Sequence, residues 1–154
     1  MKKFLATAVL VAFAVTMIGC GGGGPKASFN DFAAAIKAKD AEKSWNLLSK
    51  GTQDSFNKMY DMIKGLAAMS PEGAKELEGV TDGKTFWKKA VTSTDASSAD
   101  MTKEFENVTV TKEEVNGDKA ILTVKSGDKE EKINMIKEGG KWLLDMSQEL
   151  GGMK

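Results

Sequence analysis

The stretch VTVTKEEVNGDKAILTVKSGDKEEKINMIKEGGKWLLDM, residues 108–146, decides the fold. Apolar and polar residues alternate along it, and a period of two is typical of strands that bury one face. Asn116-Gly117 is a strong hairpin signal, because both central residues of a type I′ turn need a positive φ. Further turns are expected at 126–128 and at 138–141. The stretch therefore predicts an antiparallel meander of four strands. Its periodic apolar residues are Val108, Val110, Ala120, Leu122, Val124, Ile133, Met135, Ile136, Trp142, Leu144 and Met146.

Before this stretch the apolar residues recur with the period of a helix. The first stripe is Phe29, Phe32, Ala33 and Ile36, and the longest is Phe56, Met59, Tyr60, Ile63, Leu66 and Ala67. We expect helices to begin at residues whose side chains suit an N-cap, namely Ser28, Asp40, Thr52, Ser70 and Asp82. Gly51 is expected to end the second helix, and the polar segment 92–103 to form a loop. Helices followed by a meander predict an α+β domain, with the N-terminal helices packed on the sheet.

The composition excludes several kinds of site. The chain of 154 residues has 22 basic and 22 acidic side chains, and all the basic ones are Lys. A balanced charge without Arg argues against nucleic-acid binding. There is no His, which removes His-based catalysis and His-ligated zinc, and a single Cys cannot form an intrachain disulfide. The acidic group Asp95, Asp100, Glu104 and Glu106 does not have the spacing of an EF-hand. We therefore expect neither a metal site nor a cofactor.

The first twenty residues indicate where the protein is located. Lys2 and Lys3 precede an uncharged, mostly apolar run of 15 residues, 4–18, which is shorter than the ~20 residues of a membrane-spanning helix. That length is typical of the central region of a secretory signal. The run leads to Gly19-Cys20, which resembles the lipobox of bacterial lipoproteins, where cleavage leaves Cys as the first residue and the Cys is acylated. An uncleaved anchor with an incidental Cys is the alternative.

This resemblance divides the chain into four parts. Residues 1–19 would be the signal peptide, 20–27 the lipidated Cys20 with a Gly-rich tether, 28–148 the domain, and 149–154 a C-terminal tail. The resemblance implies a cell-envelope protein held to the membrane by lipid on Cys20. Because Gly21 is not an acidic retention signal, it implies the outer membrane facing the periplasm in a Gram-negative cell.

Two motifs suggest a family for the domain. AKDAEKSWNLLS, residues 38–49, has a helix, an acidic break and a second helix that ends in a Leu pair. INMIKEGGKWLLD, residues 133–145, has a strand that ends in Lys, a Gly turn and a return as Trp-apolar-apolar-Asp. Both resemble segments of the nuclear-transport-factor-2-like, or cystatin-like, family, over residues 28–148. The resemblance implies a cone with a cavity between sheet and helices, and a homodimer formed through the sheet.

Large aromatic residues are the candidates for lining such a cavity. They are Trp45, Phe56, Tyr60, Trp87 and Trp142. In a chain with so few large residues, most of them are expected to build the core, and a buried Tyr hydroxyl usually only finds a backbone partner. Enzymes of the family, such as ketosteroid isomerase, use an Asp and a Tyr. No motif assigns such roles here, so no catalytic residue is predicted.

The sequence leaves three classes of function. The first is a membrane-anchored envelope lipoprotein that binds a small apolar ligand or a partner protein without catalysis. The second is a structural accessory protein with no cavity. The third, an acid–base enzyme that uses carboxylates and Tyr60, has the least support in the residues.

Overall fold

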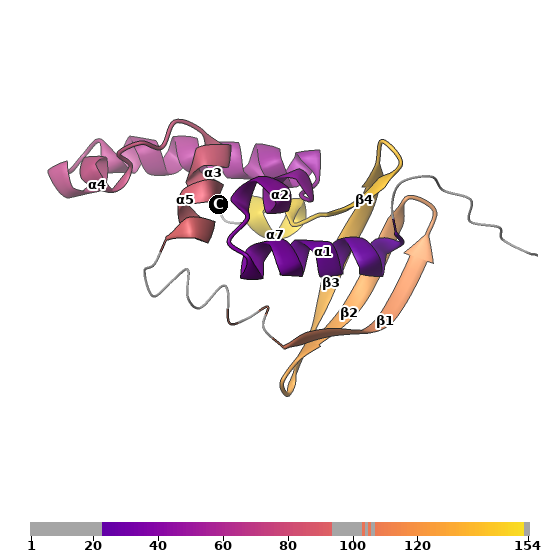
Figure 1. The fold of residues 1–154 in the computed structure, drawn as a ribbon. Helices are drawn as coiled ribbons and strands as arrows, with labels where there is room; N and C mark the ends of the chain where they lie inside the picture. The colour runs from indigo at the N-terminus through magenta and orange to yellow at the C-terminus, as the bar shows by residue number, and fades with distance from the viewer. Residues whose placement is uncertain (1–22, 94–102, 104, 106, 153–154) are drawn as a thin grey trace, which may run out of the picture.

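The computed structural model describes residues 23–93, 103, 105 and 107–152 (Figure 1). The predicted signal peptide, Gly19, Cys20 and the acidic group Asp95, Asp100, Glu104 and Glu106 lie outside these residues. The helices are α1 (Pro25–Lys37), α2 (Ala41–Asn46), α3 (Lys50–Ala67), α4 (Pro71–Glu76), α5 (Gly83–Thr92) and α7 (Ser147–Gly151). The strands are β1 (Val108–Asn116), β2 (Lys119–Ser126), β3 (Lys129–Glu138) and β4 (Lys141–Leu144). Among the described residues, no helix is long and apolar enough to cross a membrane.

The strands form one antiparallel sheet in the order β1-β2-β3-β4. The predicted α+β class and four-stranded meander are therefore confirmed. The position of the first turn differs from the prediction, because Asn116 pairs with Lys119 and the central residues are Gly117 and Asp118. Only Gly117 has a positive φ, as expected for a type II′ turn. The two positive φ angles of a type I′ turn occur instead at Gly139 (56°) and Gly140 (81°).

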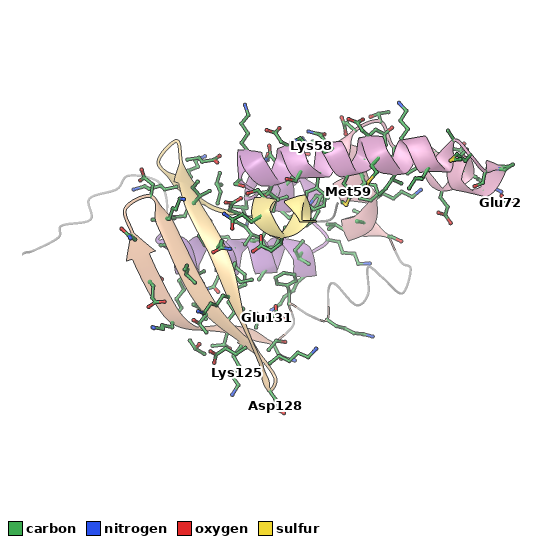
Figure 2. The ribbon with its side chains drawn as sticks, turned by 180° about the vertical axis from the view of Figure 1, so that it is seen from behind. Lys58, Met59, Glu72, Lys125, Asp128 and Glu131 are labelled. Atoms are coloured by element: carbon green, nitrogen blue, oxygen red, sulfur yellow. The ribbon has the colours of Figure 1, made fainter. Side chains whose placement is uncertain are left out.

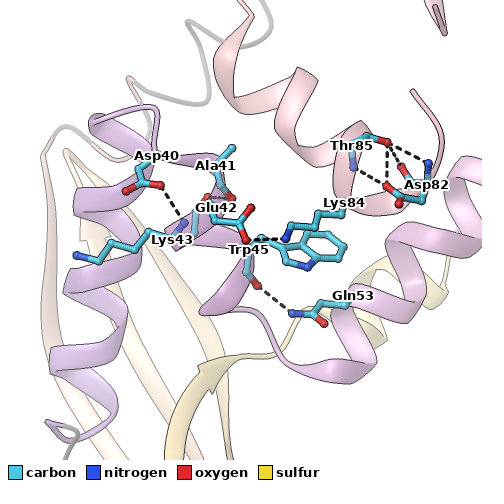
Figure 3. A network of polar contacts seen from close by, with 10 residues as sticks. Asp40, Ala41, Glu42, Lys43, Trp45, Gln53, Asp82, Lys84 and Thr85 are labelled. Atoms are coloured by element: carbon cyan, nitrogen blue, oxygen red, sulfur yellow. Dashed lines mark hydrogen bonds and ion pairs between the residues drawn. The ribbon is translucent and has the colours of Figure 1, made fainter. Parts of the chain in front are cut away.

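Three of the five predicted helix starts are confirmed, and each has a capping side chain. Asp40 accepts from the Lys43 amide, Ser70 from Gly73 and Asp82 from Thr85. Figure 3 shows the caps at Asp40 and Asp82. It also shows Glu42 of α2 bonded to Lys84 of α5 at 2.6 Å, and the Gln53 amide of α3 bonded to the Trp45 carbonyl at 3.0 Å. These bonds connect α2 to the two helices beside it.

The predictions for Ser28, Gly51 and Thr52 are wrong. Helix α3 begins at Lys50, so Gly51 lies inside it, and Thr52 is the residue whose amide donates to the capping Ser49 hydroxyl at 3.0 Å. Ser49 takes the cap because its backbone is extended (φ −61°, ψ 155°). Ser28 lies in the first turn of α1, and its hydroxyl donates to the Trp142 carbonyl on the sheet.

Both ends of the domain extend beyond their predicted boundaries. Helix α1 begins at Pro25, whose fixed φ and missing N–H suit the first turn of a helix, so the segment predicted as tether ends before Pro25 and not at 27. At the other end, α7 runs to Gly151, and Leu150 packs against the core. The predicted tail 149–154 therefore begins within a helix.

The core lies between the inner face of the sheet and the helices. Helix α1 contributes Phe29, Phe32 and Ile36, each at most 2% exposed. They belong to one cluster with the inward residues of the strands, among them Leu122 at 0% and Met135 at 2% exposed. Alternation along each strand produces this face, and the amphipathic stripe of α1 covers it.

A clasp at β4 joins the helical layer to the sheet. The turn between α2 and α3 runs parallel to β4, with a bridge between Leu48 and Leu144. The Ser49 amide donates to the Leu144 carbonyl, and the Leu144 amide donates to the Leu47 carbonyl, both at 2.8 Å. Leu48 and Leu144 are 1% and 3% exposed. We call Leu47, Leu48, Ser49 and Leu144 the β4 clasp.

Beyond the clasp, the helices reach past the sheet. In Figure 1, α1 lies against the sheet, whereas α3 and α4 extend away from it to one end of the molecule. Helix α5 packs on α3, and α4 follows at the far end, where none of its residues is buried. The chain enters α1 at the opposite end of the molecule (Figure 1).

Leu48→Ala should lower the free energy of unfolding by about 3 kcal/mol, because it removes a fully buried side chain from the clasp. Chemical denaturation measures the change. Leu143→Ala is the matched control. Leu143 is half-buried, next to Leu144 but on the other face of β4, and its loss should lower the free energy of unfolding by about 1 kcal/mol or less. Equal losses in the two variants would contradict a special role for the clasp.

Candidate functional site

The aromatic residues predicted as a pocket lie in the interior. Trp45, Phe56, Trp87 and Trp142 are 5–8% exposed and belong to the core cluster. The rings of Phe56 and Trp87 meet edge to face with centroids 5.1 Å apart, and the Trp87 indole donates to the Ser44 hydroxyl at 3.0 Å. Five hollows of the described surface are lined by other residues. The placement of these rings agrees with the expectation that most of them build the core.

Tyr60 occupies a structural position. It is 6% exposed, and its hydroxyl donates to the Val80 carbonyl at 2.9 Å, which ties α3 to the segment before α5. The Lys64 ammonium lies 5.8 Å from the ring centroid. The hydroxyl therefore satisfies a backbone carbonyl across two elements, as buried Tyr hydroxyls usually do.

A cluster of polar side chains surrounds the β4 clasp. The Ser49 hydroxyl donates to the Asp145 carboxylate at 2.9 Å, and the Thr52 hydroxyl lies 3.4 Å from the same oxygen. The Ser147 amide donates to that oxygen at 3.2 Å, and the Met146 amide donates to the Thr52 hydroxyl at 2.8 Å. Ser49 and Thr52 are fully buried. These bonds satisfy the buried hydroxyls and fix the start of α3 to the end of β4.

The electrostatics of this cluster do not suit acid–base catalysis. Burial raises the pKa of Asp145, but hydrogen bonds from Ser147, Ser49 and Thr52 outweigh it and hold the pKa below 3.8. A carboxylate with a lowered pKa is a weak base near neutral pH, and the chain has no His to activate the Ser49 hydroxyl. The arrangement is therefore a structural anchor rather than a nucleophile–base pair.

A surface groove lies on the opposite face of the sheet from the core. Its volume is about 490 Å³, and it runs over β1, β2 and β3 beside Gln148 of α7. Ile121, 39% exposed, and Ile136 lie on this outer face, because each is the neighbour of an inward residue on its strand. We call it the sheet groove. Its lining is Glu114, Val115, Asn116, Lys119, Ala120, Ile121, Asn134, Met135, Ile136, Asp145 and Gln148.

Polar groups surround the apolar part of the sheet groove. Ile121 pairs with Glu114 on one side and with Asn134 on the other. The Asn134 amide donates to the Glu149 carboxylate of α7 at 3.0 Å, so α7 forms one wall. The groove thus combines an apolar floor with acidic, amide and Lys side chains at its margin, which suits a partner with both apolar and polar groups.

The sequence interpretation did not identify the sheet groove. Its signal is a break in the alternation: Ile121 stands beside Leu122, and Ile136 beside Met135, so that these strands are apolar on both faces. That Ile121 and Ile136 lie near each other on the outer face becomes visible only when the register is known, because Ile121 pairs with Asn134 and Ile136 pairs with Lys119.

Comparisons with protein-family models, with curated proteins and with solved structures found no significant match for this chain.

Asp145→Asn should lower the free energy of unfolding at pH 7 by about 1 kcal/mol, because it removes the charge that three hydrogen bonds stabilise at a partly exposed site. The folded-state pKa is lowered, so this stabilisation is present above about pH 3.9 and is lost as the pH falls through the folded-state pKa. The difference in the free energy of unfolding between wild type and Asp145→Asn should therefore become smaller below pH 4. Denaturation at pH 7 and at pH 3 measures it.

Asp128→Asn, in the turn after β2, is the matched control and should leave the free energy of unfolding unchanged at both pH 7 and pH 3. A difference between wild type and Asp145→Asn that stays constant from pH 7 to pH 3 would contradict the role given to the Asp145 charge.

Proposed function

We propose that this chain is a lipid-anchored protein of the bacterial cell envelope whose domain binds a partner protein, without catalysis, through the sheet groove. The anchor rests on the sequence: two Lys, an apolar run of signal-peptide length and the single Cys at its end. Acylation contributes ~0.8 kcal/mol per buried CH₂, so two or three chains on Cys20 would hold the protein firmly.

The distance between anchor and domain supports a location at the membrane. Four Gly residues separate Cys20 from Pro25, the first residue of α1. Five residue steps span at most ~18 Å even when fully extended. The domain of the lipidated protein would therefore stay close to the bilayer, with the start of α1 facing it.

The observation that carries the binding proposal is the position of the apolar residues of the sheet. Inside, aromatic rings occupy part of the space between sheet and helices in which the resemblance implies a cavity, and a hollow of about 160 Å³ remains beside Phe29, Val124 and Ile133. Outside, Ile121 and Ile136 lie in a groove on a face that also carries charged residues, such as Lys112 and Glu114, which are paired at 2.9 Å. An apolar floor with a polar margin is typical of a protein-binding surface. A small apolar ligand would need a more enclosed site.

The family resemblance remains part of this proposal. The two motifs that carry it, 38–49 and 133–145, come together in the β4 clasp and at the Ser49–Asp145 hydrogen bond. That contact explains why both segments would be needed in one fold, and it supports a nuclear-transport-factor-2-like cone. The enzyme alternative has less support, because Tyr60 and Asp145 are engaged in structural bonds.

Cys20→Ser should abolish acylation, because the hydroxyl cannot form the thioether. Protein isolated from bacterial membranes should begin at Cys20 and carry the mass of two or three acyl chains, whereas the variant should retain residues 1–19 without them. Intact-mass spectrometry reads both. Gly22→Ser, two residues on, is the control and should be acylated normally. A wild-type chain that keeps residues 1–19 would contradict the anchor.

A photo-crosslinking residue at Ile121 should form a discrete adduct with a partner protein in intact cells. The same probe at Thr109, which lies on the outer face near the other end of β1, is the matched control. We expect at least several-fold more adduct from position 121, because the sheet groove includes Ile121 and not Thr109. Equal labelling at the two positions would contradict binding in the groove.

A further inference from the structure

Helix α3 has a second apolar face that the described residues do not cover. Its first face, with Phe56, Tyr60 and Ala67, is buried. Its second face has Met62 and Leu66, 55% and 63% exposed, and continues the half-buried Met59; Met69, two residues past the end of α3, follows them and is 83% exposed. A spacing of four residues places Met62 and Leu66 in one row along the helix. Met69 follows three residues after Leu66, in the turn where its amide donates to the Leu66 carbonyl at 3.0 Å. We call Met62, Leu66 and Met69 the α3 stripe.

Gly65, beside the stripe, has no structural role that the described residues account for. Gly65 lies inside α3, it is not among the residues with a positive φ, and a Cβ added there would meet no described atom within 4 Å. Gly in the interior of an exposed helix costs about 1 kcal/mol relative to Ala. Neither a turn nor internal packing accounts for that cost. A missing side chain at this position would let a second helix approach closely.

The α3 stripe is nearly symmetric about the peptide bond between Gly65 and Leu66. Met62 lies three residues before Gly65, and Met69 lies three residues after Leu66. If two α3 helices cross antiparallel at this point, Met62 of each copy lies opposite Met69 of the other. Leu66 of each copy then lies over Gly65 of the other, where no side chain obstructs it. A row with this symmetry is self-complementary, as a two-fold interface requires.

The charged residues at the two ends of the α3 stripe also favour antiparallel pairing of two α3 helices. Figure 2 shows Lys58 on α3 towards the body of the molecule and Glu72 at the far tip, in α4. The twofold axis lies ~11 Å from Lys58 along the helix, at 1.5 Å per residue. Antiparallel pairing brings Lys58 of one copy towards the tip of the other copy, which carries Glu72. The two-fold symmetry would therefore bring opposite charges, Lys58 and Glu72, towards each other at both ends of the interface.

We propose that the α3 stripe is the interface of a homodimer, in which two copies of this chain pair their α3 helices antiparallel around Gly65 and Leu66. A membrane surface is a poorer occupant, because the stripe lies at the end of the molecule opposite to the start of α1, where the chain would leave its anchor (Figure 1). The proposal does not rest on the sheet groove, which stays open in such a dimer. It also differs from the dimer through the sheet that the family resemblance implies.

The mass of the full chain in detergent tests the proposal. Sedimentation equilibrium should give a dimer for wild type. Leu66→Lys should raise the dissociation constant at least about tenfold, because it places two charges beside the twofold axis. Ile121→Lys, the matched control on the sheet, should leave the dimer intact. The circular dichroism of both variants should equal that of wild type, since Leu66 and Ile121 are exposed in the monomer. A monomeric wild type would overturn the proposal, as would a dimer that Ile121→Lys dissociates and Leu66→Lys does not.

Disulfide crosslinking tests the geometry. In the Cys20→Ser background the chain has no other Cys. Leu66→Cys, beside the proposed axis, should form a symmetric disulfide with a second copy under a mild oxidant at least about tenfold faster than Ala68→Cys. Ala68 is exposed on another side of the same helix end, and both variants keep the same uncleaved residues 1–19 in the same detergent. Equal rates would overturn the antiparallel pairing around Gly65 and Leu66.

Discussion

The pairing of the turn between α2 and α3 with β4 is the contact on which the rest of the structure depends. Strand β4 has only four residues and pairs on its sheet side with β3 alone. Its other side would expose backbone N–H and C=O groups if Leu47 and Ser49 did not bond to Leu144. The same turn begins α3 through the Ser49 cap, so one short segment completes the sheet and orients the longest helix. Two fully buried hydroxyls and the Asp145 carboxylate then fix the geometry.

Much of this fold follows from local patterns in the sequence. Alternation in 108–146 predicts the strands, and capping residues such as Asp40 and Asp82 locate two helices, because both signals depend only on neighbouring residues. The errors at Ser28 and Thr52 have one cause, which is that tertiary contacts compete for the same side chains. Ser28 suits a cap but bonds to the sheet at Trp142, and Thr52 is recruited by the Ser49 hydroxyl and by the end of β4. A single sequence does not show these long-range partners.

The candidate sites were harder to predict than the fold, for a related reason. Trp45 and Trp87 stand at helical spacing, and that spacing predicts burial equally well for a cavity wall and for a packed core. Whether their rings enclose space depends on how they meet, as the contact between Trp87 and Phe56 shows. The sheet groove and the α3 stripe arise from residues that break a simple pattern: Ile121 beside Leu122, and Met62 off the buried face of α3. Whether such residues form an exposed apolar surface can be judged only from the assembled sheet and helices.

Hydrogen exchange of backbone amides in the native protein tests the central claim about the clasp most directly. The amides of Ser49 and Leu144, which form its two hydrogen bonds, are the reporters. The account predicts that both exchange only through global unfolding, with the same free energy of opening as the slowest amides of the central strand β2. Exchange of Ser49 and Leu144 through a local opening, well before β2, would show that the helices and the sheet hold together without this contact and would contradict the account.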